Sequence, residues 1–456
     1  MNERPPRKLL MVANYFPPMA SGGNARQLRF IRYLPEFGWE PVVLSARATG
    51  PVPDPPGVRI YRAAAPGPQG MYALGRRLSA VVGRARRGLR PASGGAAGGG
   101  AAERNQAAQP PTSAAGRAGA GRPPRAFSRR HVVNDWLFVP DPYVGWVPPG
   151  VVLGRRLLRE ERFDAIFSSF PRGSTHLIAA RLAYESRLPW LADYRDPWPV
   201  RQSWQPPTAL HRWAHFTLER LALGEADAAT AINEPIADDL RRRYPALAPH
   251  VSVVPNGFDP EEEVASVDLP DDSFWIVHTG RLYGIRVEHA LRFLEALATL
   301  PDDVNVLFLG VEGLLLRDRA AELGISDRVR VEPLAPRAVA RGYQRAAGAL
   351  LLLPGVAPES LTSKIFEYLV SDRPIVALTS PGSAAARLLA DAGGGWSIMP
   401  DETLAERLAG FVRAARSGSI APPAPDKVAR FDGRRLTGEL AAVLDGMLAA
   451  EGRSAS

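Results

Sequence analysis

The segment KLLMVANYFPPMASGGNARQLRFIRYLPEFGWEPVVLSA, residues 8–46, decides the fold of this chain. It begins with a short apolar run (8–13), continues with a stretch that places Leu28 and Ile31 on one helical face, and ends with a second apolar run (41–46). A strand, a loop, an amphipathic helix and another strand predict a βαβ unit. Such units build parallel sheets, which bind ligands in the loops at the carboxyl ends of their strands.

The same alternation continues along the chain on both sides of the turn VVPNGFDP, residues 253–260. Further strands are predicted at FDAIFSS, PWLADY and DAATAI before the turn, and at 274–280, 305–310, 329–334, 349–355, 374–379 and 395–400 after it. Helical stretches separate the later strands. The sequence therefore predicts an α/β protein with two Rossmann-like, doubly wound domains that face each other across a cleft. We expect the domains at 1–250 and 251–430, followed by a C-terminal helix within 431–456 that packs back across both.

Length and composition agree with two domains and exclude several kinds of chemistry. With 456 residues, of which 46% are apolar, the chain is too long for one ordinary domain. It has no cysteine, which excludes disulfides, cysteine-liganded zinc, iron–sulfur clusters and thiol catalysis. Neither a signal peptide nor an apolar run of membrane-spanning length is recognised. We therefore expect a cytoplasmic protein, with peripheral contact at the inner face of the membrane left open.

The net charge of +9 is concentrated in one segment. Residues 66–129 contain eleven arginines and one glutamate, a balance of +10, so the rest of the chain carries −1. Within this segment, 71–90 reads either as a basic helix lying on an anionic membrane or as an ordinary surface helix. The Gly/Ala/Pro-rich stretch at about 91–125 is predicted to be a disordered insert. Basic residues are not interleaved with aromatic ones, so no nucleic-acid partner is expected.

Two loops that follow predicted strands carry residue types suited to a phosphate ligand. Gly22 and Gly23, after Ser21, let a backbone approach a ligand at a helix start, although a simple helix-entry turn explains them equally well. Arg281 and Arg286 follow the strand at 274–280. Their guanidinium groups match the oxygens of a diphosphate, but two solvated arginines remain the alternative.

The stretch PESLTSKIFEYL, residues 358–369, gives these loops a context. A buried strand leads into a loop, and Thr362 and Ser363 are suitable caps for the helix that follows. The free amides of its first turn and Lys364 form a phosphate site. Glu367 lies one turn further on, where its carboxylate can accept hydrogen bonds from the two hydroxyls of a ribose.

Five motifs together carry a resemblance to a known family: YFPPMASGGNARQLRFIRYLPEFGWEPVVL, LADYRDPWP, VVPNGFD, HTGRLYGIR and PESLTSKIFEYLVSDRPIVAL. Through them the sequence resembles the retaining GT-B glycosyltransferases of family 4, also called glycosyltransferase group 1. The resemblance spans about residues 8–400 without the low-complexity insert, and it is closest to the bacterial cell-surface polysaccharide branch.

The resemblance implies roles for individual residues. Glu359 and Glu367 match the two ends of the family's E-x7-E motif, in which the second glutamate holds the ribose and the first lies near the transferred sugar. Arg281 matches the arginine of the diphosphate clamp, while Arg286 stands where the family usually has lysine. The remaining donor-side positions are Gly22 and Gly23 beside the sugar and acceptor, Gly280 in the clamp motif, and Leu361, Thr362 and Ser363 with their backbone amides.

The acceptor side departs from the family pattern. Many members have a histidine after the strand that corresponds to PWLADY, whereas this chain has Arg195 and Asp196 there. Asp196 is our candidate for the acceptor side, and a structural Arg–Asp pair is the alternative. His176 is interpreted as a helix histidine without a catalytic role, and His278 is given no role.

The resemblance implies a retaining, metal-independent transfer of a sugar from a nucleotide sugar, such as a UDP- or GDP-sugar, to a glycan, lipid-linked or small-molecule acceptor. No cofactor is expected. Cationic groups and helix amides stabilise the negative charge that develops on the departing diphosphate. Two other functions stay open: a nucleotide-sugar epimerase of the same fold and a non-catalytic sugar-nucleotide-binding protein. A dinucleotide-dependent oxidoreductase is disfavoured because the chain lacks GxGxxG and the acid that follows it.

Overall fold

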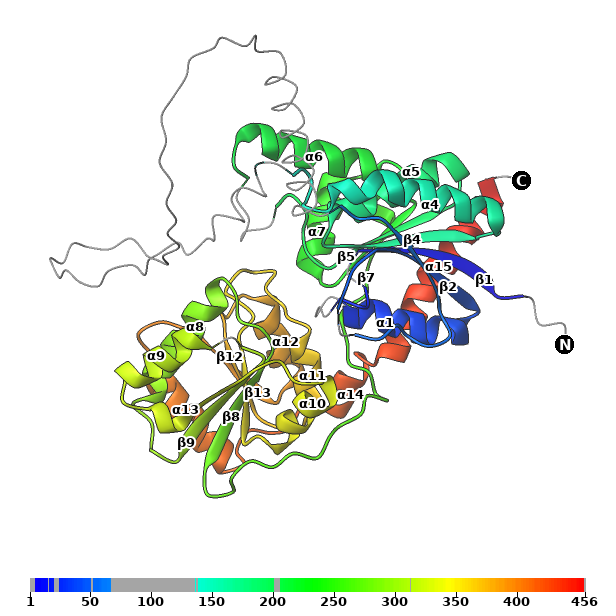
Figure 1. The fold of residues 1–456 in the computed structure, drawn as a ribbon. Helices are drawn as coiled ribbons and strands as arrows, with labels where there is room; N and C mark the ends of the chain where they lie inside the picture. The colour runs from blue at the N-terminus through cyan, green and yellow to red at the C-terminus, as the bar shows by residue number, and fades with distance from the viewer. Residues whose placement is uncertain are drawn as a thin grey trace, which may run out of the picture.

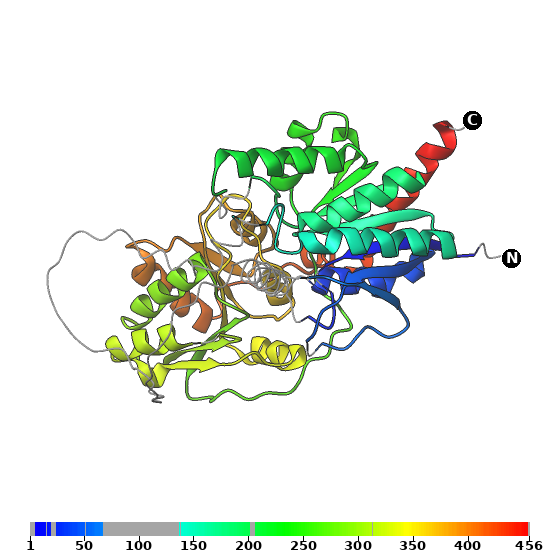
Figure 2. The same ribbon diagram turned by 45° about the horizontal axis from the view of Figure 1, so that its top comes forward.

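The structure is a computed structural model that describes residues 5–454 apart from 15, 20–23, 51, 67–135, 137, 201–205 and 312. Figures 1 and 2 show two α/β domains, each built around a twisted sheet. The basic segment 71–90 and the predicted insert at 91–125 lie outside the described residues. None of the described helices is long and apolar enough to cross a membrane.

The first domain contains a parallel sheet of seven strands in the order β3-β2-β1-β4-β5-β6-β7. The strands are β1 (Arg7–Ala13), β2 (Trp39–Ala46), β3 (Arg59–Ala63), β4 (Ala165–Phe170), β5 (Trp190–Tyr194), β6 (Ala228–Ala231) and β7 (Val251–Val253). Its helices are α1 (Asn24–Tyr33), α4 (Val147–Glu160), α5 (Gly173–Ser186), α6 (Ala209–Leu223), α7 (Glu234–Arg243) and α15 (Gly433–Ser454). The strand order reverses between β1 and β4, as in a doubly wound sheet.

The second domain repeats the arrangement with six parallel strands in the order β10-β9-β8-β11-β12-β13. These strands are β8 (Phe274–Thr279), β9 (Val304–Leu309), β10 (Val329–Glu332), β11 (Ala349–Leu352), β12 (Ile375–Leu378) and β13 (Gly395–Ile398). The helices are α8 (Ile285–Leu297), α9 (Leu314–Glu322), α10 (Arg337–Ala346), α11 (Lys364–Leu369), α12 (Ala384–Ala392), α13 (Leu404–Arg416) and α14 (Pro425–Ala429). The prediction of two Rossmann-like domains is confirmed.

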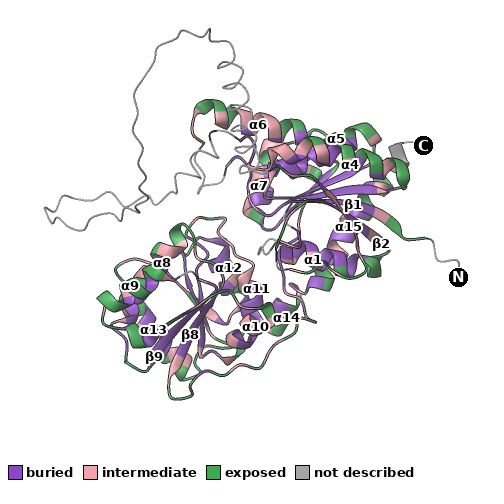
Figure 3. Cartoon of the chain, viewed as in Figure 1, coloured by how far each residue is buried: buried purple, intermediate pink, exposed green. Residues whose placement is uncertain are grey.

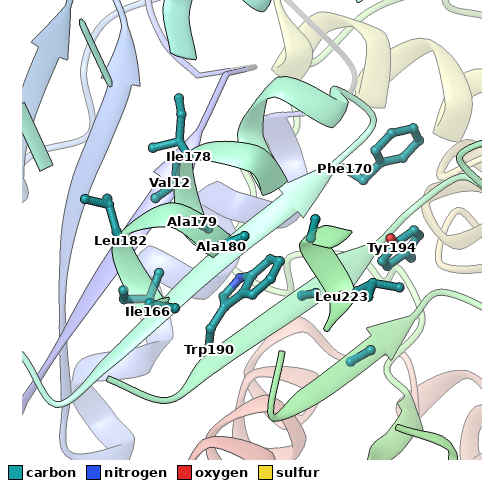
Figure 4. Close-up of a cluster of buried hydrophobic side chains, with 14 of the residues drawn as sticks. Val12, Ile166, Phe170, Ile178, Ala179, Ala180, Leu182, Trp190, Tyr194 and Leu223 are labelled. Atoms are coloured by element: carbon teal, nitrogen blue, oxygen red, sulfur yellow. The ribbon is translucent and has the colours of Figure 1, made fainter. Parts of the chain in front are cut away.

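Helices cover both faces of each sheet, so the central strands are largely buried, whereas edge strands such as β3 are half-buried (Figure 3). Alternation along β1 sends Leu10 and Val12 into the core beneath α4 and α5, while Leu9 and Met11 enter the core beneath α1 and α15. Figure 4 shows part of the first of these cores, where side chains from several strands pack against α5. Burial on both faces explains why the strands read as continuous apolar runs rather than alternating ones.

The chain crosses between the domains twice, and the two crossings pair with each other. The amide of Phe258 donates to the carbonyl of Phe431 at 3.1 Å, and the amide of Gly433 donates back to Phe258 at 2.9 Å. After the second crossing, α15 packs on the first domain, where Leu436 and Leu440 join the core beneath α1. In Figure 1 this red helix lies among the blue and cyan elements of the first domain.

The loops at the carboxyl ends of the two sheets meet. Asn233 follows β6 of the first domain, and its side-chain amide lies 3.4 Å from the carbonyl oxygen of Glu359, which follows β11 of the second domain. Ligand-binding loops of parallel sheets lie at this end of the strands. The loops that approach one another here are therefore the candidate site.

Candidate active site

Glu367 is the centre of the best-defined polar cluster at the carboxyl end of the second sheet. It is buried on α11. One carboxylate oxygen, Oε2, accepts hydrogen bonds from Lys364 Nζ at 2.9 Å and from Gln344 Nε2 at 3.3 Å. The other, Oε1, lies 3.1 Å from a guanidinium nitrogen of Arg337. The carboxylate is thus held between two cations and an amide.

These partners decide the charge of Glu367. Burial by itself would raise the pKa of this carboxyl, but the positive charges of Lys364 and Arg337 outweigh burial and lower the pKa to about 2. Glu367 is therefore ionised at neutral pH. A buried, ionised and rigidly held carboxylate is well suited to accept hydrogen bonds from a pair of hydroxyl groups.

Helix α10 supplies most of the groups that hold α11 in place. Arg337, Arg341 and Gln344 follow each other at helical spacing, so they lie on one side of α10. Arg341 donates to the carbonyl oxygen of Glu367 at 2.6 Å and to Gln344 Oε1 at 2.8 Å. Gln344 in turn donates to Thr279, the last residue of β8, at 2.8 Å. Sequence reasoning missed these α10 residues.

The start of α11 differs from its prediction. The helix covers only Lys364–Leu369, and Ser363 at its N-cap has helical backbone angles and makes no side-chain capping bond. Thr362 instead accepts a 3.4 Å hydrogen bond from the amide of Lys364. The expected Ser363 cap is therefore wrong. The amides of Leu361, Thr362 and Ser363 make no hydrogen bond to another described residue, so they remain available to a ligand.

The loop that carries Glu359 is fixed by the beginning of α12. Amides of this helix donate to the carbonyls of Pro358, at 2.8 Å, and Ser360, at 3.1 Å. The Thr379 hydroxyl donates to the carbonyl of Gly355 at 2.6 Å, and Gly355 has a φ of +102°, a conformation that favours glycine. Glu359 itself is half-buried. The structure thus places this glutamate on a braced loop at the contact with the first domain.

The clamp loop after β8 brings Gly280 and Lys364 together. A side-chain carbon at Gly280, which has a φ of +114°, would lie 3.3 Å from Lys364 Cε, so the glycine leaves room for the lysine. Arg286 is half-buried beneath the ring of Tyr283, with 4.7 Å between its guanidinium carbon and the ring centroid. Arg281 is exposed and forms no ion pair with another described residue.

Buried His278 shows that this loop and α11 share one electrostatic environment. Burial, followed by the positive charges of Arg286 and Lys364, lowers the pKa of His278 to about 4. Its Nδ1 lies 2.9 Å from the carbonyl oxygen of Leu351 on β11. Neutral His278 therefore joins β8 to β11 beneath the cationic groups.

In the first domain, the buried acid at the end of β5 is Asp193 rather than Asp196. Asp193 is fully buried and accepts hydrogen bonds from Arg26 at 2.8 Å, Ser169 at 2.7 Å and Thr230 at 2.9 Å. Burial opposes its charge, but the Arg26 guanidinium prevails and lowers the pKa of Asp193. Asp193 is thus an ionised group that joins β4, β5, β6 and α1.

The predicted acceptor-side residues lie beside this network. Asp196 is half-buried and has no hydrogen bond to another described residue, while Arg195 donates to the carbonyl of Phe170 at 2.7 Å. His176 is fully buried, with its Nδ1 2.7 Å from the Ser168 hydroxyl. Burial lowers the pKa of His176 to about 3, so this residue belongs to the core.

Two buried amides near the start of the first domain were missed by sequence reasoning. Gly22 and Gly23 lie outside the described residues, as does Ser21, but Asn14 and Gln27 flank that loop. Both side chains are buried, and neither amide has a hydrogen-bond partner in the described structure. A polar residue directly after a predicted strand was the available signal for Asn14.

Helix α1 of the first domain also approaches the Glu367 cluster. Burial, followed by the positive charges of Arg26 and Arg337, lowers the pKa of Arg29 to about 9, and Glu367 counteracts this effect. Arg29 donates to the carbonyl of Gly257 in the interdomain linker. The candidate site thus combines a cationic loop, an ionised carboxylate and free amides from the second domain with charged groups from the first.

The fold defines the class, since known structures of the GT-B type share the architecture. Sucrose-phosphate synthase from Thermosynechococcus elongatus matches over 99% of this chain and 100% of its own, with a TM-score of 0.61 and 15% identity. Anabaena Alr3699/HepE, crystallised with UDP-glucose, matches over 96% of this chain and 100% of its own, with a TM-score of 0.58 and 15% identity. The chain therefore has the GT-B fold.

Within this class, residues 113–262 match the family model described as Glycosyltransferase Family 4. Two curated relatives are D-inositol 3-phosphate glycosyltransferases. The one from Thermobifida fusca is 29% identical over 35% of this chain and 45% of its own length. The one from Nocardiopsis dassonvillei is 28% identical over 47% of this chain and 55% of its own length. The chain thus spans about half the length of the curated relatives it matches. The predicted resemblance to family 4 is confirmed.

Proposed function

We propose that this chain is a retaining glycosyltransferase that moves a sugar from a nucleotide sugar to a glycan, lipid-linked or small-molecule acceptor without a metal ion. The observation that carries the proposal is the ionised, buried Glu367 beside Lys364, next to a loop with free amides. In this proposal Glu367 accepts hydrogen bonds from the ribose hydroxyls. The diphosphate then lies over Gly280, within reach of Lys364 and the clamp arginines.

The charges of the site match the chemistry of the transfer. The bond between the anomeric carbon and the diphosphate oxygen breaks, a bond from that carbon to the acceptor oxygen forms, and the acceptor proton passes to the departing diphosphate. Negative charge develops on the departing diphosphate. Arg281, Arg286, Lys364 and the amides of 361–363 stabilise this charge, which is usually the largest catalytic contribution. Glu359 lies toward the transferred sugar, and Asp196 serves the acceptor side.

The relatives supply starting points for the substrates. The match to a protein crystallised with UDP-glucose supports a UDP-sugar as the first donor to test. The curated relatives are named for an inositol phosphate acceptor, so a phosphorylated polyol belongs among the first acceptors beside lipid-linked glycans. The same proposal gives the chain a role in the synthesis of cell-surface polysaccharide and a cytoplasmic location. It also includes contact of the basic segment 71–90 with the membrane.

The proposal is tested by incubating the purified chain with UDP- and GDP-sugars, with and without acceptors, and following nucleoside diphosphate release. Glu367→Ala is expected to raise the donor KM about 10- to 100-fold, because it removes hydrogen bonds to a charged group. Arg281→Ala is expected to lower kcat about 100-fold, as for other groups that stabilise developing charge. NMR of the product gives the anomeric configuration.

A matched control is Glu288→Ala, which removes an exposed glutamate from α8 of the same domain. Its kinetics should equal those of the unmodified chain. Normal donor kinetics in both site variants, or interconversion of the free nucleotide sugar with no acceptor needed, would contradict the proposed transfer.

A further inference from the structure

Arg337, the first residue of α10, connects the candidate ribose-binding carboxylate to the segment that joins the domains. Its guanidinium group lies 3.1 Å from Glu367 Oε1 and also forms an ion pair with Glu262. Resting on the proposed function, we infer that Arg337 is a positioning residue: anchored by Glu262, it orients Glu367 to receive the donor ribose. Neither Arg337 nor Glu262 belongs to the sequence motifs that carry the resemblance to family 4.

Glu367 can accept a hydrogen bond from a ligand while Arg337 stays bound to it. A carboxylate offers about four lone-pair sites, two on each oxygen. Lys364 and Gln344 approach Oε2, whereas Arg337 approaches Oε1. Oε1 therefore keeps acceptor capacity for a ribose hydroxyl. Because Arg337 holds the second oxygen, it also restricts the rotation of the carboxylate about its terminal bond more than the contacts at Oε2 alone would.

Glu262 is a suitable anchor because the linker is itself held from both sides. On the side of the second domain, the amide of Ala265 donates to the carbonyl of Ala338 at 3.0 Å, so the linker runs along α10. On the side of the first domain, the Tyr33 hydroxyl donates to Asp259 at 2.7 Å. The Glu262 side chain is only 16% exposed. Arg337, on α10, is thus held by a fixed linker segment while it contacts the carboxylate that it orients.

The inference predicts an effect on the recognition of ribose, which a merely structural role would not produce. The measurement is the dissociation constant, by calorimetry, of UDP and of its 2′,3′-dideoxy analogue, or of the GDP pair if the unmodified chain prefers guanine. The unmodified chain is expected to bind the ribose form about 10- to 100-fold more tightly, as hydrogen bonds to a charged group allow. Arg337→Ala should bring this ratio close to one, and Glu262→Gln should lower it by a smaller factor.

Conservative and control variants complete the test. Arg337→Lys keeps a charge but cannot contact both glutamates through a planar fork, so an intermediate ratio is expected. Arg345→Ala removes an exposed arginine from the same helix and should leave the ratio unchanged. A ratio of constants does not depend on the folded fraction, so loss of stability in a variant does not imitate the effect.

The outcomes separate this inference from the proposed function. If the unmodified chain favours the ribose form, and Arg337→Ala preserves the ratio that Glu367→Ala abolishes, Arg337 does not position Glu367 and the inference is overturned while the donor site stands. If the unmodified chain binds ribose and dideoxyribose forms equally, or binds neither nucleotide, the ribose site fails and this inference fails with it.

Discussion

Replacing Glu367 by glutamine tests the electrostatic core of the candidate site without adding or removing bulk. The pKa of this carboxyl falls from its ordinary value of 4.5 to about 2 in the folded chain. A depression of this size corresponds to roughly 3 kcal/mol of stability at neutral pH. Because the folded-state pKa is depressed, this contribution is complete above pH 4.5 and is lost as the pH falls toward 2. At pH 3 only roughly 1 kcal/mol should remain.

The assay is urea denaturation of the unmodified chain and of Glu367→Gln at pH 7 and pH 3. The difference in unfolding free energy should be roughly 3 kcal/mol at pH 7 and should fall to roughly 1 kcal/mol at pH 3. Glu288→Gln is the control, since it weakens only an exposed pair with Arg292 and should cost under about 0.5 kcal/mol. A difference for Glu367→Gln that is small at pH 7, or equal at the two pH values, would refute the picture of a charge held by Lys364 and Arg337.

Three further outcomes are expected. Arg26→Met should lower the unfolding free energy by about 3–5 kcal/mol, because it leaves the fully buried Asp193 without its cation; Asp193→Asn in the same chain should restore part of the loss in urea denaturation. Treatment with EDTA should leave the rate of sugar transfer unchanged, since the proposed site uses cationic side chains; a rate restored only by Mg²⁺ or Mn²⁺ would contradict this. Deletion of 66–129 should reduce flotation with anionic vesicles, and equal flotation would remove the membrane contact.

The parallel sheets were predictable because a strand that is buried on both faces needs apolar residues at successive positions, which appear in the sequence as apolar runs. The runs at 8–13, 274–280 and 349–355 begin within a residue of strands in the structure. Two strands were missed, β3 and β7. The three residues of β7, VSV, are too few to show a period, and β3, RIYRA, is an edge strand with half-buried, partly charged residues. Their pairing depends on neighbouring strands, which local sequence does not reveal.

The candidate site was partly predictable for a different reason. Gly280, Lys364 and Glu367 lie on loops and a helix directly after strands, so sheet topology alone brings them together. Arg337 and Gln344 reach the same carboxylate from α10, and no local pattern tells which of several helical polar residues points there. Similarly, Asp193 and Arg26 pair across 167 positions of the chain, so the buried acid of β5 could not be distinguished from the loop residue Asp196.

The paired crossings of the chain have a consequence for protein engineering. Phe258 and Phe431 are hydrogen-bonded neighbours at 3.1 Å, and α15 completes the core of the first domain. The second domain is therefore an insertion whose two ends are adjacent, rather than the second half of a tandem pair. It can be excised or exchanged as a cassette at two neighbouring junctions, and a chimera that keeps α15 with the first domain preserves the hydrophobic cores of both parts.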